Sequence, residues 1–357
     1  MAKLLKNILN PVITEDIEEI IRCDIPWETL YGKTILVTGA SGMIPSYVVY
    51  TLLQLNDCRD MHLRVLGMAR NREKAQKILG PLMGRDDFDL IIQDVCTPFD
   101  PEENIDYIFH GGSAARPASH KTAPVETIRA NTIGTFNLLD LAVRKKAAGF
   151  VLFSSSEVYG SVTSADHNIT EDMYGFIDIL NPRSCYSEGK RAAETICACY
   201  TAQYGMRCVM PRFAHIYGPG MALDDGRVQA EFASCVIHDQ DIVLNSDGSS
   251  VRAYTYVADA VSGMFYLLLN SDETACNVAD SGGIVSIREL AEAFIAARPE
   301  KNLHLHVKAS DKKTGMYNPA SFIALDDSKL KSLGWSAAVD LRTGIDRTLS
   351  YHEYYNK

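Results

Sequence analysis

A β-rich run that passes through a glycine turn into a helical stretch constrains the fold of this chain most strongly. Thr34–Thr38 has the composition of a buried strand, Gly39-Ala-Ser-Gly42 that of a tight turn, and Tyr47–Leu55 that of an apolar helix. Glycines let a backbone approach a ligand, and the start of a helix supplies free N–H groups and a positive dipole. This succession of elements predicts a site for a pyrophosphate.

Strand and helix patterns alternate from Lys33 onward, which is typical of a parallel sheet covered by helices. We therefore expect an α/β fold, with a doubly wound parallel Rossmann sheet in residues 32–215 and a return segment at about 250–270. Turn signals after Tyr217 predict that residues 216–357 form a smaller C-terminal α/β lobe that binds the substrate. The expected strands are Thr34–Thr38, Leu63–Met68, Asp89–Gln93, Tyr107–His110, Phe150–Ser154 and Cys208–Arg212, and the expected helices are Ile44–Leu55, Arg72–Leu79, Pro124–Ala142 and Ser184–Gln203.

Residues 1–31 have the pattern of an arm added before this sheet. Thr14 is expected to cap a helix that carries Glu15 and Asp16 in its first turn. Four isoleucines give the helix one apolar stripe, and this stripe must dock on another part of the protein. They are Ile13, Ile17, Ile20 and Ile21.

The composition excludes several kinds of protein. With 357 residues, 46% of them hydrophobic, the chain can bury a large core, and a net charge of −10 argues against general binding to nucleic acid or to an anionic membrane. Nine cysteines without a C-x-x-C pair, and no apparent leader or membrane-length segment, predict a cytoplasmic protein with reduced thiols. Neither Cys197 with Cys199 nor His304 with His306 offers enough ligands for zinc, so no metal is predicted.

Tyr186 and Lys190 lie four residues apart and would share one face of a helix. An ammonium beside a phenol can lower the pKa of the phenol, which makes it a proton acceptor for an alcohol that is being oxidised. Isolated pairs of this kind occur on many amphipathic helices, where the tyrosine packs and the lysine is solvated. Here the run Ser154–Gly160 follows an expected strand, so it belongs at the crevice beyond the carboxyl ends of the strands.

Taken together, these motifs resemble the extended short-chain dehydrogenase/reductase family that modifies nucleotide sugars, the epimerases and dehydratases. The resemblance runs from about Lys33 to about Leu269, and among branches the chain is most similar to UDP-glucuronate decarboxylase (UDP-xylose synthase). The motifs that carry it are Asn131-Thr-Ile-Gly-Thr135, Ser155-Ser-Glu-Val-Tyr-Gly160, Pro182-Arg-Ser-Cys-Tyr-Ser-Glu-Gly-Lys-Arg-Ala-Ala-Glu194, Asp225-Gly-Arg227 and Arg252-Ala-Tyr-Thr-Tyr-Val257.

The resemblance implies roles for individual residues. Tyr186 would be the general base, Lys190 would hold the nicotinamide ribose and tune the tyrosine, and Ser155 would bind the reacting hydroxyl. Arg227 and Arg252 resemble phosphate clamps, and a guanidinium suits a diphosphate. Further cofactor contacts would come from Gly39, Ser41, Gly42, Met43, Ile44, Arg70, Asp94, Val95, Gly112 and Asn131, and further substrate contacts from Arg116 and His215.

Ser156 and Glu157 bear on the reaction that follows the oxidation. In the related 4,6-dehydratases an aspartic acid at the first position protonates the departing C6 hydroxyl, and Ser156 has no carboxyl proton to deliver. Related 4-epimerases usually lack a carboxylate at the second position. Ser-Glu resembles the decarboxylase pattern, so UDP-glucuronate decarboxylation is the leading expectation. A 4,6-dehydratase, a 4-epimerase and a non-catalytic cofactor-binding sensor or scaffold are the alternatives.

Three positions depart from the family pattern. Pro45 stands where the fingerprint has its third glycine, so the packing must differ, although proline is allowed in a first helical turn. Arg70 stands where an acidic residue would hold the ribose, which favours NADP, whereas the decarboxylases retain NAD. His215 replaces an asparagine that touches the substrate phosphates and could add a pH-dependent charge. NAD is the expected cofactor, with NADP as the alternative.

The two long helices after the nucleotide site predict an oligomer. Pro124–Ala142 and Ser184–Gln203 resemble the helices that form a four-helix bundle between subunits in the family, and both carry surplus apolar residues. We therefore expect a homodimer with a nucleotide sugar as its substrate.

Overall fold

A computed structural model describes residues 5, 8–162, 168–308 and 322–355. Its main feature is a sheet whose strands pair only in parallel, in the order β12-β7-β5-β4-β1-β2-β3, with β6 paired to β7. The order runs outward in both directions from the boundary between β1 and β4, and this reversal confirms the doubly wound sheet. The strands are β1 (Thr34–Thr38), β2 (Arg64–Ala69), β3 (Phe88–Ile92), β4 (Tyr107–His110), β5 (Gly149–Leu152), β6 (Ser154–Ser155), β7 (Cys208–Phe213) and β12 (Ala275–Val278).

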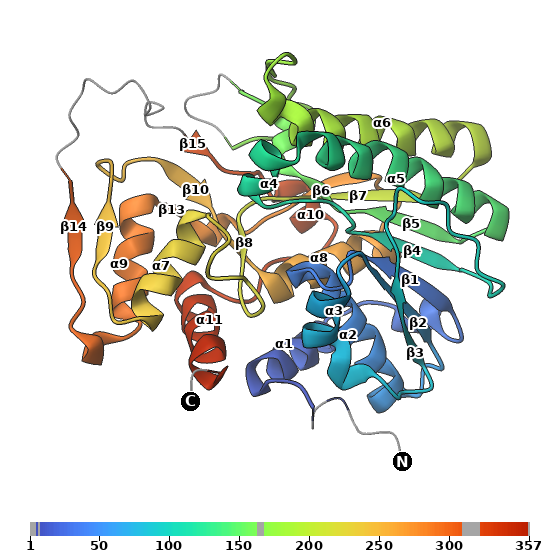
Figure 1. Cartoon of the computed structure of the whole chain (residues 1–357), viewed down its shortest axis with the longest axis horizontal. Coiled ribbons are helices and arrows are strands. Elements are labelled where there is room, and N and C mark those ends of the chain that lie inside the picture. The colour runs from blue at the N-terminus through green and yellow to red at the C-terminus, as the bar shows by residue number, and fades with distance from the viewer. Residues whose placement is uncertain (1–4, 6–7, 163–167, 309–321, 356–357) are drawn as a thin grey trace.

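Helices cover both faces of this sheet (Figure 1). Helices α2 (Met43–Arg59) and α8 (Val257–Asn270) pack on one face, and α5 (Pro124–Lys145) and α6 (Cys185–Tyr204) pack on the other. Alternate residues of β1 enter the two cores, since Ile35 and Val37 join one apolar cluster while Leu36 joins the other. A strand buried on both faces is apolar throughout, which is why its sequence predicted it.

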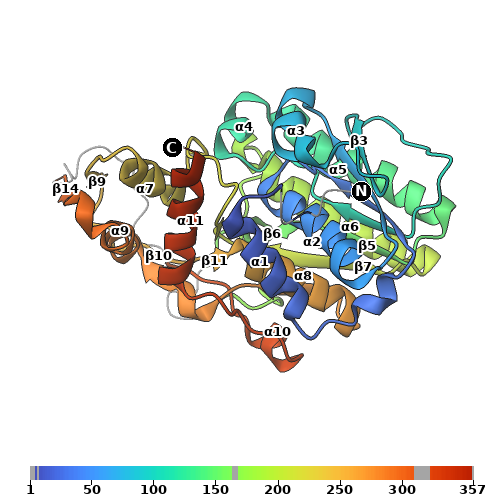
Figure 2. The ribbon, with the colours of Figure 1, turned by 90° about the horizontal axis from the view of Figure 1, so that it is seen from below.

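The remaining elements form a smaller lobe beside the sheet and the connections around it. Figure 2, seen from below, shows the elements of the lobe at one end of the molecule. Its short sheets have the orders β13-β10-β15, β11-β8 and β14-β9. The strands are β8 (Ile216–Tyr217), β9 (Ile242–Leu244), β10 (Val251–Ala253), β11 (Thr255–Tyr256), β13 (Ile284–Ser286), β14 (Leu305–Val307) and β15 (Phe322–Ile323). The other helices are α1 (Pro11–Arg22), α3 (Arg72–Leu79), α4 (Pro117–Thr122), α7 (Val228–Ile237), α9 (Ile287–Ala296), α10 (Ser328–Ser332) and α11 (Leu341–Tyr355), with 3-10 turns η2 (Trp27–Leu30), η3 (Gly80–Leu82), η4 (Ser156–Tyr159), η5 (Pro182–Ser184), η6 (Ser281–Gly283) and η7 (Pro299–Lys301).

The chain returns to the main sheet further along than expected. The predicted return segment at about 250–270 covers α8, but β12 follows it at Ala275–Val278 and pairs with β7. This strand falls within residues 216–357, which were assigned to the substrate lobe. The other domain boundaries stay predictions. No helix in the described parts of the chain has the length and apolar character needed to cross a membrane.

Helix α1 begins earlier than the sequence suggested. The prediction that Thr14 caps this helix is wrong: the helix starts at Pro11, and the side-chain oxygen of Asn10 accepts a hydrogen bond from the N–H of Val12 at 2.9 Å. Proline suits a first helical position because its missing N–H would have no partner there, and asparagine is a favoured cap. The predicted isoleucine stripe is confirmed, since all four of its residues are buried.

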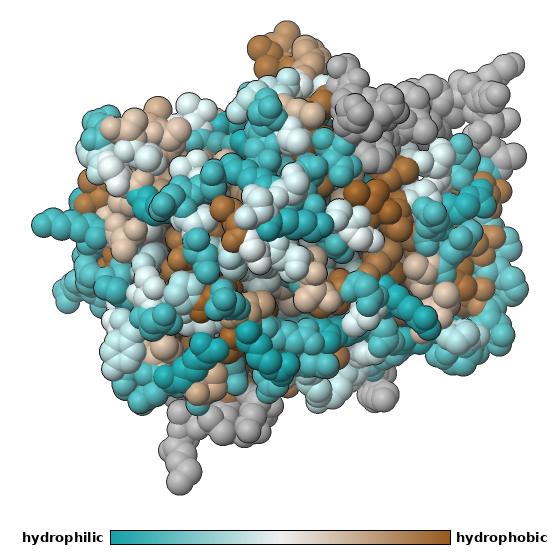
Figure 3. Space-filling model, turned by 180° about the vertical axis from the view of Figure 1, so that it is seen from behind, coloured by the Kyte–Doolittle hydropathy of each residue, from teal (hydrophilic) through white to brown (hydrophobic). Residues whose placement is uncertain are grey.

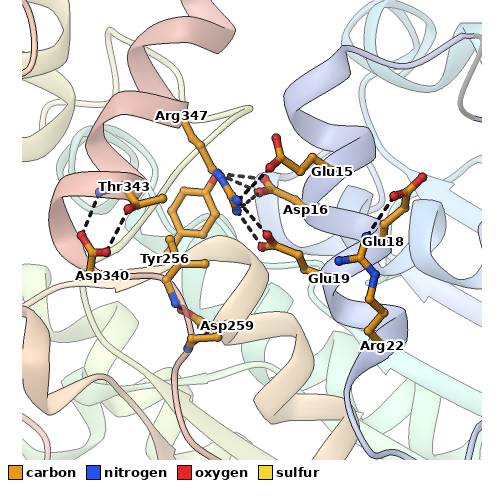
Figure 4. A network of polar contacts seen from close by, with 12 residues as sticks. Glu15, Asp16, Glu18, Glu19, Arg22, Tyr256, Asp259, Asp340, Thr343 and Arg347 are labelled. Carbon is orange, nitrogen blue, oxygen red and sulfur yellow. Dashed lines mark hydrogen bonds and ion pairs between the residues drawn. The ribbon is translucent and has the colours of Figure 1, made fainter.

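Figure 4 shows how α1 is joined to the rest of the protein. The carboxylate of Asp16 accepts hydrogen bonds from Tyr47 of α2 at 2.6 Å and from Tyr256 of β11 at 2.8 Å. Arg347 of α11 donates to Asp16 at 3.0 Å and to both carboxylate oxygens of Glu19 at 2.7 Å. Helix α1 therefore connects the sheet to the last described helix.

Candidate active site

A cavity of about 490 Å³ lies at the carboxyl ends of the strands, where the strand order reverses. Parallel sheets of this kind bind ligands at that reversal. Several positively charged side chains line the cavity beside two carboxylates, Glu157 and Asp225. The cationic residues are Arg70, Lys74, Arg116, Arg183, Lys190 and Arg227. A cavity of this charge suits an anionic ligand, although the chain as a whole is acidic.

The glycine turn has the geometry that a close backbone approach requires. Gly39 has φ +67°, and a Cβ there would lie 2.5 Å from the carbonyl oxygen of Gly111. Gly42 precedes α2, whose first residues Met43 and Ile44 line the cavity together with it, while Ser41 is buried behind them. The free N–H groups of this helix start are the groups that the sequence predicted to receive a pyrophosphate, and this role stays a prediction.

Pro45 is accommodated by a second glycine. It lies in the first turn of α2, where a missing N–H costs no hydrogen bond. A Cβ on Gly111 would come within 2.7 Å of the Pro45 ring, so the small residue at 111 makes room for the proline. Pro45 therefore fits beside Gly111 without breaking the helix.

The predicted adenosine end lies beside the main cavity. Arg70 is mostly exposed and its guanidinium is 3.6 Å from the carboxylate of Asp94. Burial opposes ionisation of Asp94, but hydrogen bonds to Cys96 and the charge of Arg70 lower its pKa overall. Val95 packs where side chains on Gly112 or Gly134 would collide with it. Of these residues only Arg70 is among those that line the main cavity.

Tyr186 and Lys190 lie together on α6, as predicted, and both are buried. The Lys190 ammonium lies 5.8 Å from the centre of the Tyr186 ring and donates a hydrogen bond to the carbonyl oxygen of Phe153 at 2.6 Å. Burial lowers the pKa of Lys190 to about 8. Asn131 of α5 is buried beside Gly189 of α6. The side-chain amide of Asn131 donates a hydrogen bond to the carbonyl oxygen of Thr127 at 2.9 Å.

Several neighbouring groups act on the pKa of Tyr186, and the predicted effect of Lys190 on this pKa stays a prediction. Burial raises the pKa of Tyr186, and the groups that oppose this rise are the Ser155 hydroxyl and the charges of Arg227 and Arg183. The Lys190 ammonium donates one hydrogen bond to the carbonyl oxygen of Phe153 and lies 5.8 Å from the centre of the phenol ring.

The Ser155-Ser156-Glu157 turn faces the cavity from the end of β6. The Ser155 hydroxyl oxygen accepts the N–H of Glu157 at 3.2 Å. One carboxylate oxygen of Glu157 is 3.1 Å from Arg183, and the other accepts the Ser187 hydroxyl at 2.6 Å. Glu157 is therefore a carboxylate fixed by two partners at the wall of the cavity.

Sequence reasoning missed Arg183 and Ser187 as site residues. Both lie within the stretch Pro182–Glu194 that carried the resemblance, Arg183 one helical turn before Tyr186 and Ser187 directly after it. Their position next to the expected base was the signal that could have identified them. Their contact with Glu157 depends on how α6 meets the strand ends, which no sequence spacing reveals.

The predicted substrate residues are only partly brought together. Arg116 and Arg227 line the cavity, where Arg116 is 3.4 Å from Asp224 and Arg227 is 2.7 Å from Asp225. Arg252, on β10, is not among the lining residues, and it donates to the carbonyl oxygen of Val251 at 2.7 Å. Its charge nevertheless acts on the neighbouring His215.

His215 lines the cavity in a left-handed conformation, with φ +46°. Burial, followed by the charges of Arg252 and Arg227, lowers its pKa to about 4. The expected pH-dependent charge therefore falls well below neutral pH, and the imidazole is neutral under physiological conditions. A neutral imidazole still offers one donor and one acceptor to a ligand.

A nicotinamide dinucleotide fits this site on observations other than its motifs. Three lining residues, Ser113, His120 and His215, each hold a buried polar atom without a hydrogen-bond partner in the described part of the protein. Buried polar groups are normally paired, so such atoms mark places where a ligand can bind. Within the described residues no group of three or more His, Cys, Asp or Glu side chains is arranged to hold a metal ion.

Behind the cavity wall, a buried network supports the serine turn. Glu194 accepts hydrogen bonds from the Ser154 hydroxyl at 2.5 Å and from two nitrogens of Arg212 at 3.0 and 2.7 Å. Arg212 also donates to the hydroxyl of Tyr159 at 3.0 Å, and that hydroxyl donates to Asn277 at 2.5 Å. The network ties β7, α6 and β12 to the turn that carries Glu157.

A helix start open to phosphate at the switch point, and a buried tyrosine and lysine facing it, define an α/β dinucleotide-binding protein of the dehydrogenase/reductase type. The sequence pattern of the NAD dependent epimerase/dehydratase family matches residues 35–279. The chain belongs to this NAD dependent family, which confirms the predicted resemblance and the expected cofactor, NAD.

Two of the most similar curated relatives are UDP-glucuronic acid decarboxylases. UDP-glucuronic acid decarboxylase 1 of Danio rerio is 31% identical, over 89% of this chain and 72% of the relative. UDP-glucuronic acid decarboxylase 6 of Arabidopsis thaliana is 33% identical, over 87% of this chain and 86% of the relative.

Solved structures confirm the fold. UDP-glucuronic acid 4-epimerase of Bacillus cereus, in complex with UDP-glucuronic acid and NAD, has a TM-score of 0.73 at 21% identity, covering 90% of this chain and 99% of its own. dTDP-glucose 4,6-dehydratase of Bacillus anthracis, in complex with NAD, has a TM-score of 0.73 at 18% identity, covering 90% of this chain and 97% of its own. At these identities the likeness concerns the fold alone.

Proposed function

We propose that this protein is an enzyme that oxidises C4 of a nucleotide sugar transiently, and that its reaction is the decarboxylation of UDP-glucuronate. The observation that carries the proposal is the Ser156-Glu157 pair facing the cavity beside Tyr186, since a serine at the first position cannot serve the dehydration of C6. The similarity to UDP-glucuronic acid decarboxylases over most of the chain supports the same reaction.

The residues of the chain divide the work of oxidation. Tyr186 accepts the proton of the C4 hydroxyl, and Ser155, which lies beside it, orients that hydroxyl by a hydrogen bond. Lys190 holds the nicotinamide ribose, and the turn Gly39–Gly42 receives the pyrophosphate. Bound NAD would supply the acceptor for the C4 hydride and, once reduced, the donor that returns it.

Decarboxylation follows from the chemistry of the oxidised sugar. A ketone at C4 is β to the carboxylate on C5, so carbon dioxide can leave while its bonding electrons form an enolate. The enolate then takes up a proton at C5, and reduction of C4 completes the product. The protein has to position the sugar and exclude water, and the burial of Tyr186 favours this exclusion.

Cationic side chains at the cavity mouth would hold the diphosphate. Arg227 and Arg116 are the proposed phosphate ligands, and Lys74 lies near them with its pKa lowered by burial and by the charge of Arg116. A guanidinium can bind two phosphate oxygens at once. His215 would contribute a neutral hydrogen bond.

The test is to incubate the protein with UDP-glucuronate and NAD and to follow carbon dioxide and the sugar nucleotide by mass spectrometry. UDP-xylose or its 4-keto precursor is the expected product. A C4 epimer of unchanged mass would favour a 4-epimerase, and a 4-keto-6-deoxy product from another nucleotide sugar would favour a dehydratase. A chain that binds NAD and turns over no nucleotide sugar would be a sensor or scaffold.

We also propose a homodimer formed through α5 and α6. The exposed side chains of Val125, Ile128 and Phe136 lie on α5, and Ile179 and Leu180 protrude just before α6. Figure 3 shows hydrophobic residues on the projection at the top of the view, which is this segment before α6. Twice the monomer mass by light scattering is expected, and a monomer would contradict the proposal. The cytoplasmic location stays a prediction.

A further inference from the structure

His120 on α4 is a buried side chain in contact with the proposed base, and the mechanism does not use it. Its ring is stacked on the ring of Tyr186, with centroids 4.6 Å apart and planes inclined by 15°. The residue is 3% exposed and still lines the cavity. No sequence motif pointed to it, because α4 and α6 are 63 residues apart from Thr122 to Cys185 and meet only in the fold.

The orientation of this imidazole is fixed from the other side. Its Nε2 lies 2.9 Å from the carbonyl oxygen of Ala114. A carbonyl only accepts hydrogen bonds, so Nε2 carries the proton and Nδ1 is an acceptor. Ala114 belongs to the loop that carries Arg116, and the His120 carbonyl accepts the thiol of Cys185, next to Tyr186, at 3.8 Å. His120 thus contacts both the loop that carries Ala114 and Arg116 and the start of α6.

The stability of the fold does not account for a histidine here. Nδ1 is buried without a hydrogen-bond partner in the described part of the protein, and an unpaired buried acceptor costs free energy. Burial and the charge of Arg183 lower the pKa of His120, so the ring is neutral near pH 7. A neutral aromatic ring favours a flat stacked contact, which restricts the rotation of the phenol beneath it.

We propose that His120 is a positioning residue for Tyr186, which holds the phenol ring by stacking. The inference rests on the proposed role of Tyr186 as the base. Precise placement of a catalytic group matters because a small displacement lowers the rate of a step that depends on near contact. The charged groups that face this pair are Arg183, Glu157, Arg227 and Lys190.

The test compares His120→Phe with His120→Leu. Both variants are apolar and close in size, both lose the bond to Ala114, and only phenylalanine keeps a flat ring over Tyr186. We expect His120→Phe to keep kcat within about 3-fold of the wild type and His120→Leu to lose at least about 10-fold, with KM for the sugar nucleotide changed by less than about 3-fold in either. Thermal unfolding confirms that each variant is folded.

A second measurement needs no substrate. Tyrosine labelled with carbon-13 at its hydroxyl-bearing carbon is titrated by NMR, and Tyr186→Phe identifies the resonance. Because an alkyl group admits water to the phenol, the pKa of Tyr186 should fall in His120→Leu and stay near the wild-type value in His120→Phe. Equal titrations in all three proteins would overturn the inference, whether or not UDP-glucuronate is decarboxylated. So would equal kcat values in an active enzyme.

Discussion

At the scale of single residues, the proposed catalytic side chains Glu157 and Tyr186 are held in place by contacts with neighbouring side chains. Glu157 is held by Arg183 and Ser187, and Tyr186 lies between the Ser155 hydroxyl and the His120 ring. The sequence predicted Tyr186, Lys190 and Glu157, because their spacing follows a strand end or a helix turn, and the structure brings all three to one cavity. Arg183, Ser187 and His120 were not predicted, because their contacts with Glu157 and Tyr186 depend on how α4, η5 and α6 meet the strand ends.

Replacing the base should remove turnover without removing the cofactor. Tyr186→Phe keeps the ring and its stack on His120 but has no hydroxyl to accept a proton. General base catalysis contributes about 10²- to 10⁴-fold, so kcat should fall by about that factor. NAD binding, measured by calorimetry, should change by less than about 3-fold. Unchanged turnover would show that another group takes the proton.

Arg183 should matter for turnover although it is absent from the predicted site. In Arg183→Gln the carboxylate of Glu157 loses its cation and keeps only Ser187. A hydrogen bond to a charged group contributes about 1.5–3 kcal/mol, so kcat/KM for UDP-glucuronate should fall by about 10- to 100-fold. Arg144→Gln, which removes an exposed arginine of α5 near Asp100, is the matched control and should behave as the wild type. Equal effects of the two changes would contradict the role of Arg183.

At the scale of elements, apolar periodicity predicted the sheet and its helices well. Strands β1 and β4 and helix α3 have the predicted ends, and α2, α5 and α6 differ from the predictions by at most four residues at either end. These segments bury whole faces, so their patterns are strong. The start of α1 was missed because its cap, Asn10, lies before the apolar stripe, and β12 was missed because one short strand leaves little pattern.

The buried network behind the serine turn should dominate local stability. Arg212→Leu would leave Glu194, whose side chain is only 13% exposed, without its guanidinium. Breaking a buried ion pair by removing one partner costs about 3–5 kcal/mol, which urea unfolding would measure. Adding Glu194→Gln should recover part of that loss, because the orphaned charge is removed. If the double variant is less stable than the single one, the pair does not act as described.

At the scale of the whole molecule, α1 acts as a joint between the sheet and α11. The side chain of Asp16 is fully buried. It contacts Tyr47 of α2, Tyr256 of β11 and Arg347 of α11. The arm was expected to dock somewhere, and its apolar stripe was correct. Its partners could not be predicted, because Arg347 follows Asp16 by 331 residues.

The free energy of unfolding should depend on pH because Asp16 titrates. Burial raises the pKa of this carboxyl from 3.8 to about 6, so between about pH 4 and 6 the folded protein holds a proton that the unfolded chain releases. The contribution of Asp16 to stability therefore falls as pH rises through this window. In Asp16→Asn this loss is absent, so the stability of the variant relative to the wild type should rise by up to about 3 kcal/mol between pH 4 and 7.

Urea unfolding of both proteins at the two pH values gives this difference. The control is Glu18→Gln, on the exposed side of the same helix, where Glu18 lies 3.1 Å from Arg22. Removing an exposed ion pair should change stability by less than about 1 kcal/mol at either pH. A relative stability of Asp16→Asn that does not depend on pH would contradict the assigned ionisation.

The contact between α1 and α11 can form only late in synthesis, because its two helices are far apart in the sequence. Helix α1 leaves the ribosome early, but the guanidinium that pairs with Asp16 and Glu19 is made 331 residues after Asp16. At about 5–20 residues per second, the acidic face of α1 waits roughly 15–70 seconds for its partner. The nascent chain therefore carries the acidic side chains of α1 without their guanidinium partner until α11 emerges.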